Sequence, residues 1–163
     1  MNITVLQCLA VGLHGLLELE VYVHATEDES KVMKAIGNIL PKDLYEKISF
    51  DKVKARGHYG NPIIIIKAEV KVEDLESLSK HILDKMESYD REYVRKSLEI
   101  FVDSVGTIHF RFDKQEAYLG RIVLKSSDPI CLRLRFEIPP GRGLDPVRYV
   151  RGILFEEVRR SSC

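Results

Sequence analysis

The sequence has 163 residues, a length typical of one domain, and 45% of them are hydrophobic while 31% are charged. This balance can fill a hydrophobic core and excludes a disordered chain. The formal net charge is zero, which argues against general attraction to nucleic acid through excess positive charge. Three widely spaced cysteines fit neither a disulfide framework nor a zinc ribbon, which favours a reducing, cytoplasmic location.

The charges are unevenly distributed along the chain. Nine of the twelve arginines follow residue 100, whereas eleven of the thirteen lysines precede it, so a local arginine-rich face is compatible with the neutral total. Residues 2–17 contain no charged side chain, but they lack the basic flank of a secretory signal and are short for a membrane span. We therefore expect one domain over residues 1–163, with residues 1–16 as an apolar N-terminal extension and no membrane contact.

Five segments predict strands of one main sheet. The alternation is clearest near the C-terminus, where apolar residues alternate with Cys131, Arg133 and Arg135, so both arginines should face away from the core. Four consecutive isoleucines favour a central strand, and two glycines with a proline before them predict a β-hairpin turn. The predicted strands of this sheet are 18–24, 47–55, 62–70, 107–112 and 130–137. A further short strand is expected at 121–124.

Helices are predicted between these strands from apolar spacing and from capping residues. Thr26 to Glu29 and Asp113 to Glu116 each follow a strand and have the pattern of a capping box. Asp145 and Pro146 are typical first residues of a last helix, within a loop-and-helix segment over 139–163. Because the strands cluster in hairpins, the predicted class is a two-layer α+β fold, a mixed sheet with helices mainly on one face.

The sequence contains no specific catalytic or metal-binding motif, so no cofactor and no metal site are expected. A metal could use His24 with Glu27 or Asp28. Carboxylates in a first helical turn usually complement the helix dipole, and this interpretation is the favoured one.

Three places could bind a phosphate anion. The glycine-rich segment from Arg56 to Pro62 can turn backbone N–H groups toward an anion, although turn chemistry alone favours a plain hairpin turn. Arg111, Lys114 and Gln115 could converge at a helix N-terminus, where the Asp113 carboxylate would oppose the anion. Arg133 and Arg135 form a row suited to phosphates, and the alternative is a solvated sheet face.

Three stretches resemble an archaeal family of RNA-binding proteins, the predicted exosome subunits. They are His24 to Asp28 with Lys31 and Val32 following, Gly57 to Ile63, and Arg111 to Gly120. The resemblance runs from about Leu19 to Phe136. It implies a fold like that of ribosomal protein L5 and a role in RNA binding and RNA processing, and it supplies no catalytic residues.

We therefore expect a non-catalytic RNA-binding accessory factor with RNA, and exosome or other RNA-processing proteins, as partners, and with a homo-oligomer possible. The alternatives are a small nuclease or phosphohydrolase using His24, His58 and Asp113, or a protein-interaction module that touches no RNA. Aromatic stacking on Tyr59 or Tyr118 would accompany the phosphate contacts. The candidate RNA-binding residues are Arg56, Gly57, His58, Tyr59, Gly60, Asn61, Arg111, Lys114, Gln115, Tyr118, Arg133 and Arg135.

Overall fold

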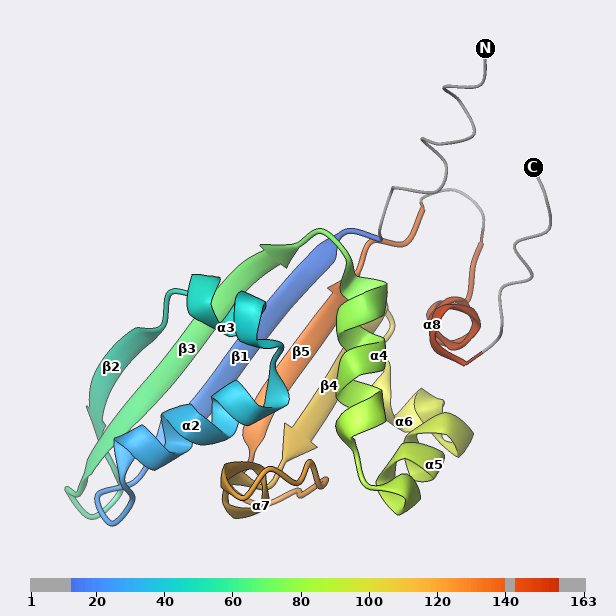
Figure 1. Ribbon diagram of the computed structural model, residues 1–163. Helices are drawn as coiled ribbons and strands as arrows, with labels where there is room; N and C mark the ends of the chain where they lie inside the picture. The colour runs from blue at the N-terminus through green and yellow to red at the C-terminus, as the bar shows by residue number, and fades with distance from the viewer. Residues whose placement is uncertain (1–12, 140–142, 156–163) are drawn as a thin grey trace.

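The computed structural model describes residues 13–139 and 143–155, and its centre is a five-stranded sheet (Figure 1). All four pairings between its strands are antiparallel, and within the described ranges a parallel contact occurs only as the isolated bridge between Met86 and Ile122. The sheet order is β2-β3-β1-β5-β4, so each of the five expected segments contributes a strand. The strands are β1 (Gly15–Val23), β2 (Asp51–Arg56), β3 (Pro62–Val72), β4 (Thr107–Phe112) and β5 (Ile130–Phe136).

The helices lie on one side of this sheet. In Figure 1, α2, α3 and α4 cross in front of the strands, α5, α6 and α8 lie beyond the β4 edge, and α7 follows the end of β4. The expected two-layer α+β class is confirmed, with the difference that the sheet, expected to be mixed, is antiparallel in all four strand pairings. The helices are α2 (Glu29–Ile39), α3 (Lys42–Lys47), α4 (Leu75–Lys85), α5 (Ser88–Lys96), α6 (Leu98–Phe101), α7 (Lys114–Tyr118) and α8 (Pro146–Leu154).

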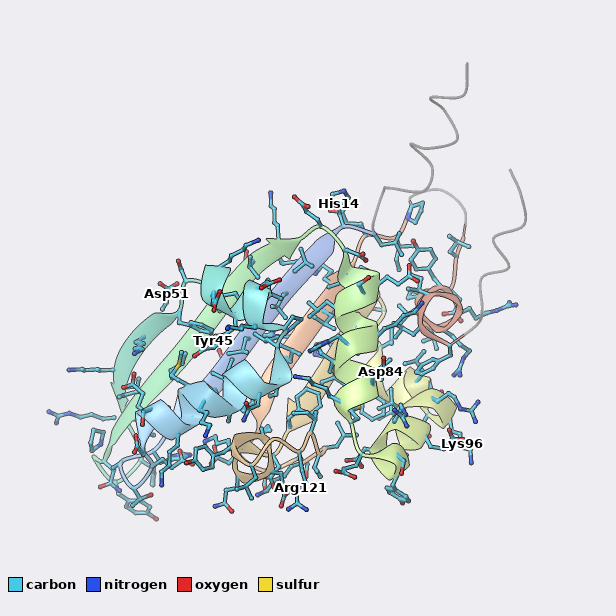
Figure 2. All side chains as sticks on the ribbon, viewed as in Figure 1. His14, Tyr45, Asp51, Asp84, Lys96 and Arg121 are labelled. Atoms are coloured by element: carbon cyan, nitrogen blue, oxygen red, sulfur yellow. The ribbon has the colours of Figure 1, made fainter. Side chains whose placement is uncertain are left out.

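One continuous hydrophobic core lies between the sheet and the helices. Alternation puts Leu17, Leu19 and Val21 of β1 inside, and in β5 every second residue from Ile130 to Phe136 is buried. Each fully buried large aliphatic or aromatic side chain stabilises the fold by about 1.5–3 kcal/mol. Charged side chains such as Lys96 and Arg121 point away from the sheet (Figure 2).

Two of the expected helix starts are correct and one is wrong. Asp113 and Asp145 are the N-cap residues of α7 and α8. Thr26 is not a cap. It lies in a turn, and Asp28 caps α2 by accepting a hydrogen bond from the Ser30 amide. The Glu27 carboxylate accepts a hydrogen bond from the His24 backbone N–H, and this contact closes the turn that precedes α2.

Other boundaries also differ from the expectation. The predicted strand at 121–124 forms only isolated bridges, and the short helix α3, which the sequence did not predict, begins directly after Pro41. Among the described residues, no helix has the length and apolar character required to cross a membrane. The N-terminal extension and the end of the last predicted helix fall mostly outside the described residues, although Gly15 and Leu16 belong to β1.

Candidate nucleic-acid interface

The sheet face opposite the helices carries the predicted arginine row. Arg133 lies across from His109, Arg135 lies across from Thr107, and Arg111 lies across from Cys131 in the β4–β5 register. These side chains face away from the core because their strand neighbours, such as Phe110 and Leu134, are buried in it. On this half of the open face, the side chains within β4 and β5 include no carboxylate.

No arginine of this row forms an ion pair with a described residue, although Glu18 of β1 lies across from Arg133 in the sheet register. The described arginines that form ion pairs are Arg95, Arg121 and Arg151, all outside the row. On the β1 and β3 half of the same face, acidic and basic residues are mixed, and Lys67 lies 3.2 Å from the Glu20 carboxylate. The three arginines without an ion pair therefore lie together on β4 and β5, which are adjacent strands at one side of the sheet.

The glycine-rich turn between β2 and β3 lies apart from this row. The Gly57 N–H donates to the Asn61 carbonyl (2.8 Å) and the Gly60 N–H donates to the Gly57 carbonyl (2.9 Å). Both amides expected to face an anion are therefore engaged within the turn. Tyr59 is 88% exposed and packs edge-on against His58, with their ring centroids 4.9 Å apart.

The cations of the expected RNA-binding surface lie on two different faces of the sheet. Arg56 alternates in phase with Lys52, and Lys52 pairs with Glu29 at the start of α2, on the helix side. Arg133 and Arg135 lie on the opposite side. An RNA that contacted all of these cations would have to pass around the end of the sheet, so the arginine row and the turn are separate sites.

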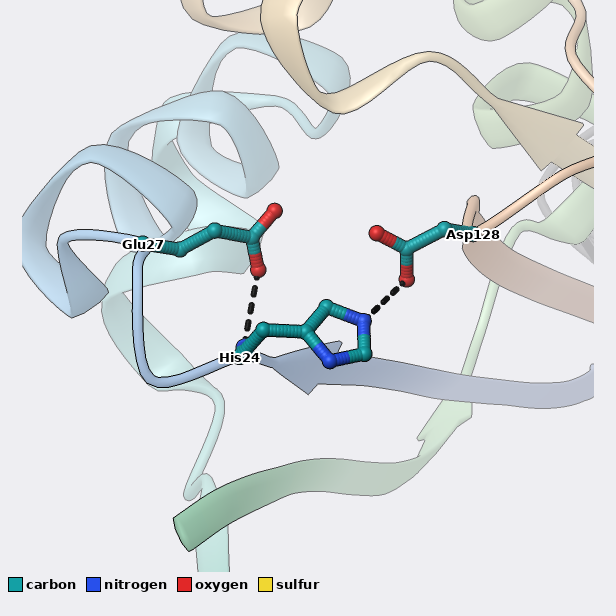
Figure 3. A group of neighbouring side chains, drawn as sticks. All are labelled: His24, Glu27 and Asp128. Carbon is teal, nitrogen blue, oxygen red and sulfur yellow. Dashed lines mark hydrogen bonds and ion pairs between the residues drawn. The ribbon is translucent and has the colours of Figure 1, made fainter. Parts of the chain in front are cut away.

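The three sequence stretches that carried the resemblance meet at one end of the sheet. His24 follows β1, and its Nε2 lies 3.0 Å from an oxygen of Asp128, which precedes β5 (Figure 3). Glu27 accepts the His24 backbone N–H at 2.9 Å. His24 and residues of the 57–61 turn line a common small pocket of about 230 Å³.

Lys114 completes this cluster and differs from its expected role. Its ammonium group lies 3.0 Å from each oxygen of Asp128 and 3.1–3.2 Å from those of Glu27. It also donates to the Tyr22 carbonyl, and only 8% of its side chain is exposed. Two carboxylates and a carbonyl therefore satisfy its charge, and we remove Lys114 from the candidate RNA contacts.

The position of Lys114 also argues against a metal ion at His24, Glu27 and Asp128. His24, Glu27 and Asp128 each offer a ligand atom within 4.8 Å of one another. The Lys114 ammonium already supplies a cation to both carboxylates. Burial raises the pKa of Asp128, but hydrogen bonds and charge from Lys114 and His24 outweigh it and hold that pKa below its usual value. Asp28, the other acid considered as a ligand, is engaged as the cap of α2.

Tyr118 and Gln115 line a second pocket, of about 390 Å³, between α2 and α7. The ammonium groups of Lys31 and Lys34 lie 5.7 and 4.9 Å from the centre of the Tyr118 ring. This cation–π contact uses the ring that was expected to stack on a base. Gln115 is exposed, while its backbone N–H donates to the Asp113 carboxylate.

The three residues of the alternative enzyme hypothesis do not form one set. His24 and His58 line the small pocket together, but the Asp113 carboxylate accepts the Gln115 and Glu116 amides at the start of α7. Asp113 also pairs with Lys125 at 3.3 Å. The arrangement therefore contains no nucleophile with an adjacent base that would indicate hydrolysis.

Sequence reasoning missed a larger pocket, of about 500 Å³, at the outer edge of β4. Tyr93 and Phe101 come from α5 and α6, His109 and Arg111 from β4, and Lys125 from the segment before β5. Alternation indicated where Arg111 points. Nothing in the sequence indicated that a helix ending near residue 101 would place aromatic rings beside it.

Residues 17–137, which include the whole arginine row, match the family described as "RNA binding", and the chain belongs to this RNA-binding family. It is 32% identical over 138 residues to RNA-binding protein PAB1135 of Pyrococcus abyssi, covering 83% of this chain and 90% of that protein. It is 39% identical over 117 residues to protein MJ0213 of Methanocaldococcus jannaschii, covering 70% of this chain and 78% of that one.

Solved structures share the fold. The crystal structure of protein AF2318 of Archaeoglobus fulgidus, assigned to the DUF54 family, has a TM-score of 0.70 and 30% identity. The match covers 86% of this chain and 99% of that chain. The family description and the name of the Pyrococcus relative both refer to RNA binding.

Proposed function

We propose that this protein binds single-stranded RNA across the β4–β5 half of its open sheet face and catalyses no reaction. The observation that carries the proposal is the row of Arg111, Arg133 and Arg135, which form no ion pair with another described residue. Guanidinium groups bind phosphate oxygens through two parallel hydrogen bonds and are suited to an RNA backbone. Membership of the RNA-binding family supports the choice of RNA as the ligand.

A single strand suits this surface better than a duplex. Sheet faces bind single-stranded RNA by stacking its bases on aromatic side chains while cations hold the backbone. Tyr22 of β1 is 40% exposed on the same face and offers such a ring. Tyr59, at the hairpin turn, is exposed enough to stack on a base that leaves the sheet at that end.

The test is the salt dependence of RNA binding. The Arg133→Ala and Arg135→Ala double variant should bind single-stranded RNA more weakly for every sequence, because phosphate contacts carry no base specificity. Its plot of log affinity against log salt should be flatter than that of the wild type by about one to two units.

A matched control removes two arginines from the helical layer, Arg95→Ala with Arg148→Ala. This control changes the net charge equally and should leave the slope of the wild type nearly unchanged. An identical loss in both double variants would indicate a general charge effect and contradict the proposed face. Thermal melting of each variant shows whether it is folded.

The cellular role that we propose is that of an accessory factor in archaeal RNA processing, in the cytoplasm and linked to the exosome. The support is the resemblance of the three sequence stretches that meet near His24, Gly57 and Lys114. Affinity purification from native archaeal lysate, with sequencing of bound RNA and identification of bound proteins, tests this role. Absence of exosome or processing proteins would remove it, and superposition on ribosomal protein L5 tests the related expectation about the fold.

A further inference from the structure

The pocket at the outer edge of β4 is bounded by an aromatic wall. Tyr93 of α5 packs edge-on against Phe101 of α6 with 5.5 Å between the ring centroids, and Phe101 in turn contacts Phe110 of β4 at 6.2 Å. These contacts hold the Tyr93 ring, which is still 43% exposed. Beside it, Ile100 is 66% exposed, which is unusual for an isoleucine in a folded domain.

The floor of the pocket is a short stretch of strand edge. Toward the start of β4, the Asp103 N–H donates to the Thr107 carbonyl (3.0 Å). Toward its end, the Lys125 N–H donates to the Arg111 carbonyl (2.9 Å). Because strand residues alternate, the N–H and C=O of His109 point to this same outer edge. The His109 N–H faces the Phe101 carbonyl across the isolated antiparallel bridge between Val102 and Ile108. The His109 C=O has no backbone partner among the described residues.

The rim of the pocket is cationic. Arg111 is exposed, and Lys125 lies at the rim with 45% of its side chain exposed, where its ammonium group also pairs with the Asp113 carboxylate at 3.3 Å. The carboxylate of Asp103 is already engaged, because one oxygen accepts from the Val105 and Thr107 amides and the other lies 2.8 Å from His109 Nε2. This acid therefore holds the His109 ring and leaves the cationic rim in place.

We propose that this pocket binds one unpaired nucleotide of the RNA, an inference that rests on the proposed function. The base lies against Tyr93 and Ile100, and a donor on its hydrogen-bonding edge meets the C=O of His109. The phosphate lies between Arg111 and Lys125. Arg111 belongs to both the pocket and the arginine row, so the strand can run from the open face over the β4 edge without a break.

The size of the open edge favours a base over an added peptide strand. The edge is closed by hydrogen bonds at Thr107 and Arg111, which are four residues apart, or about 13 Å along a strand. Peptides that add to a sheet need a longer run of unpaired backbone to form their ladder. One flat base with an aromatic wall on one side needs only the single free carbonyl that β4 offers at His109.

The experiment uses a single-stranded RNA octamer of adenosines in which one base is replaced by 2-aminopurine, whose fluorescence reports stacking. Tyr93→Leu removes the ring and keeps an apolar side chain against Phe101. It should weaken binding at least about fivefold, the lower end of the range for one lost base stack. Its 2-aminopurine signal on binding should also be smaller than that of the wild type.

Tyr89→Leu is the matched control, because Tyr89 is on the same helix, 83% exposed and outside the pocket. Lys125→Ala is a second pocket variant at a surface position and should weaken the octamer while it flattens the salt dependence by about one unit. Competition by adenosine monophosphate, measured as release of the octamer, should be lost in both pocket variants and kept in Tyr89→Leu.

The outcomes separate this inference from the proposed function. Wild-type protein that fails to bind the octamer overturns both. If the octamer binds through Arg133 and Arg135 but neither Tyr93→Leu nor Lys125→Ala changes its affinity, the pocket inference is wrong and the arginine face stands. With that second result, the exposed Tyr93 and Ile100 would instead be assigned to contact with a partner protein.

Discussion

The ammonium group of Lys114 lies 3.0 Å from both carboxylate oxygens of Asp128, although 14 residues separate the two in sequence. Glu27 approaches the same ammonium from the start of the helical layer, 87 residues away. Lys114 thus joins the β1–α2 turn, the start of α7 and the loop before β5. This contact explains why its side chain is buried in a protein whose other described lysines are exposed.

Removing this cation should destabilise the protein without directly affecting RNA contacts. Lys114→Met keeps most of the side-chain volume but leaves Glu27 and Asp128 close together with no counter-charge. Because both acids are partly exposed, we expect a loss of about 1–3 kcal/mol in the free energy of unfolding, less than for a fully buried pair.

Chemical denaturation measures this loss. A Lys114→Met protein of unchanged stability that no longer binds RNA would contradict the structural role and return Lys114 to the RNA surface. Lys31→Met, on the exposed side of α2, provides the control for loss of one positive charge.

Alanine substitution should affect stability differently at the two expected capping boxes. Asp113 accepts the Gln115 amide at 2.8 Å and the Glu116 amide at 3.0 Å, so Asp113→Ala should cost about 1–2 kcal/mol of stability. Thr26 caps no helix, and Thr26→Ala should change stability by less than about 0.5 kcal/mol. Urea melts of the two variants measure the difference, and equal losses would show that the assignment of the α2 cap is wrong.

The sequence predicted the sheet well because alternation determines which face a strand residue occupies. Ile130, Leu132 and Leu134 must enter the core, and that requirement alone places Arg133 on the open face. Short helices were less predictable. Six residues form α3 without a side-chain cap and without a fully buried residue, so neither capping nor periodicity marks it.

The sequence predicted the candidate site only for side chains whose orientation is determined by a single strand. Lys114 was misplaced because its partners come from two distant segments, and no local pattern reports a contact across 87 residues. The edge pocket was missed for the same reason, since Tyr93 and His109 are brought together by the packing of α5 and α6 beside β4. The amides of the 57–61 turn had the right glycines for an anion, but the turn itself uses them.

Stability should decrease as the pH falls below about 4. Burial raises the pKa values of Asp103, Asp113 and Asp128, but hydrogen bonds to each ionised carboxylate outweigh burial and leave all three pKa values lowered from 3.8. The folded state therefore binds fewer protons than the unfolded state in this range. The stabilisation is present above the unfolded pKa and is lost as the pH falls through the folded values.

Denaturant melts between about pH 2.5 and 6 measure this dependence. Asp103→Asn should be less stable than the wild type near neutral pH, and its stability should fall less steeply in acid because one of the three groups no longer titrates. A wild-type protein whose free energy of unfolding rises on acidification would contradict the sign derived from these contacts.

Cys131 provides a chemical probe of the arginine face. It is half-buried on the open side of β5, between Glu20 of β1 and Arg111 of β4. Burial raises the pKa of its thiol, Glu20 raises it further, and Arg111 and Arg133 act in the opposite direction. Alkylation is therefore best followed near pH 9, where enough thiolate is present to react. Cys8→Ser and Cys163→Ser remove the other two thiols.

Saturating single-stranded RNA should slow alkylation of Cys131 severalfold, because a strand held by Arg111 and Arg133 covers the thiol between them. In the Arg133→Ala and Arg135→Ala variant, the same RNA concentration should protect much less, while the rate without RNA reports any change in the thiol itself. Duplex RNA of equal length is the control for general charge screening and should protect less than the single strand. Equal alkylation rates with and without bound single-stranded RNA would place the RNA elsewhere on the protein, since no strand could follow this row of arginines and leave Cys131 open to the reagent.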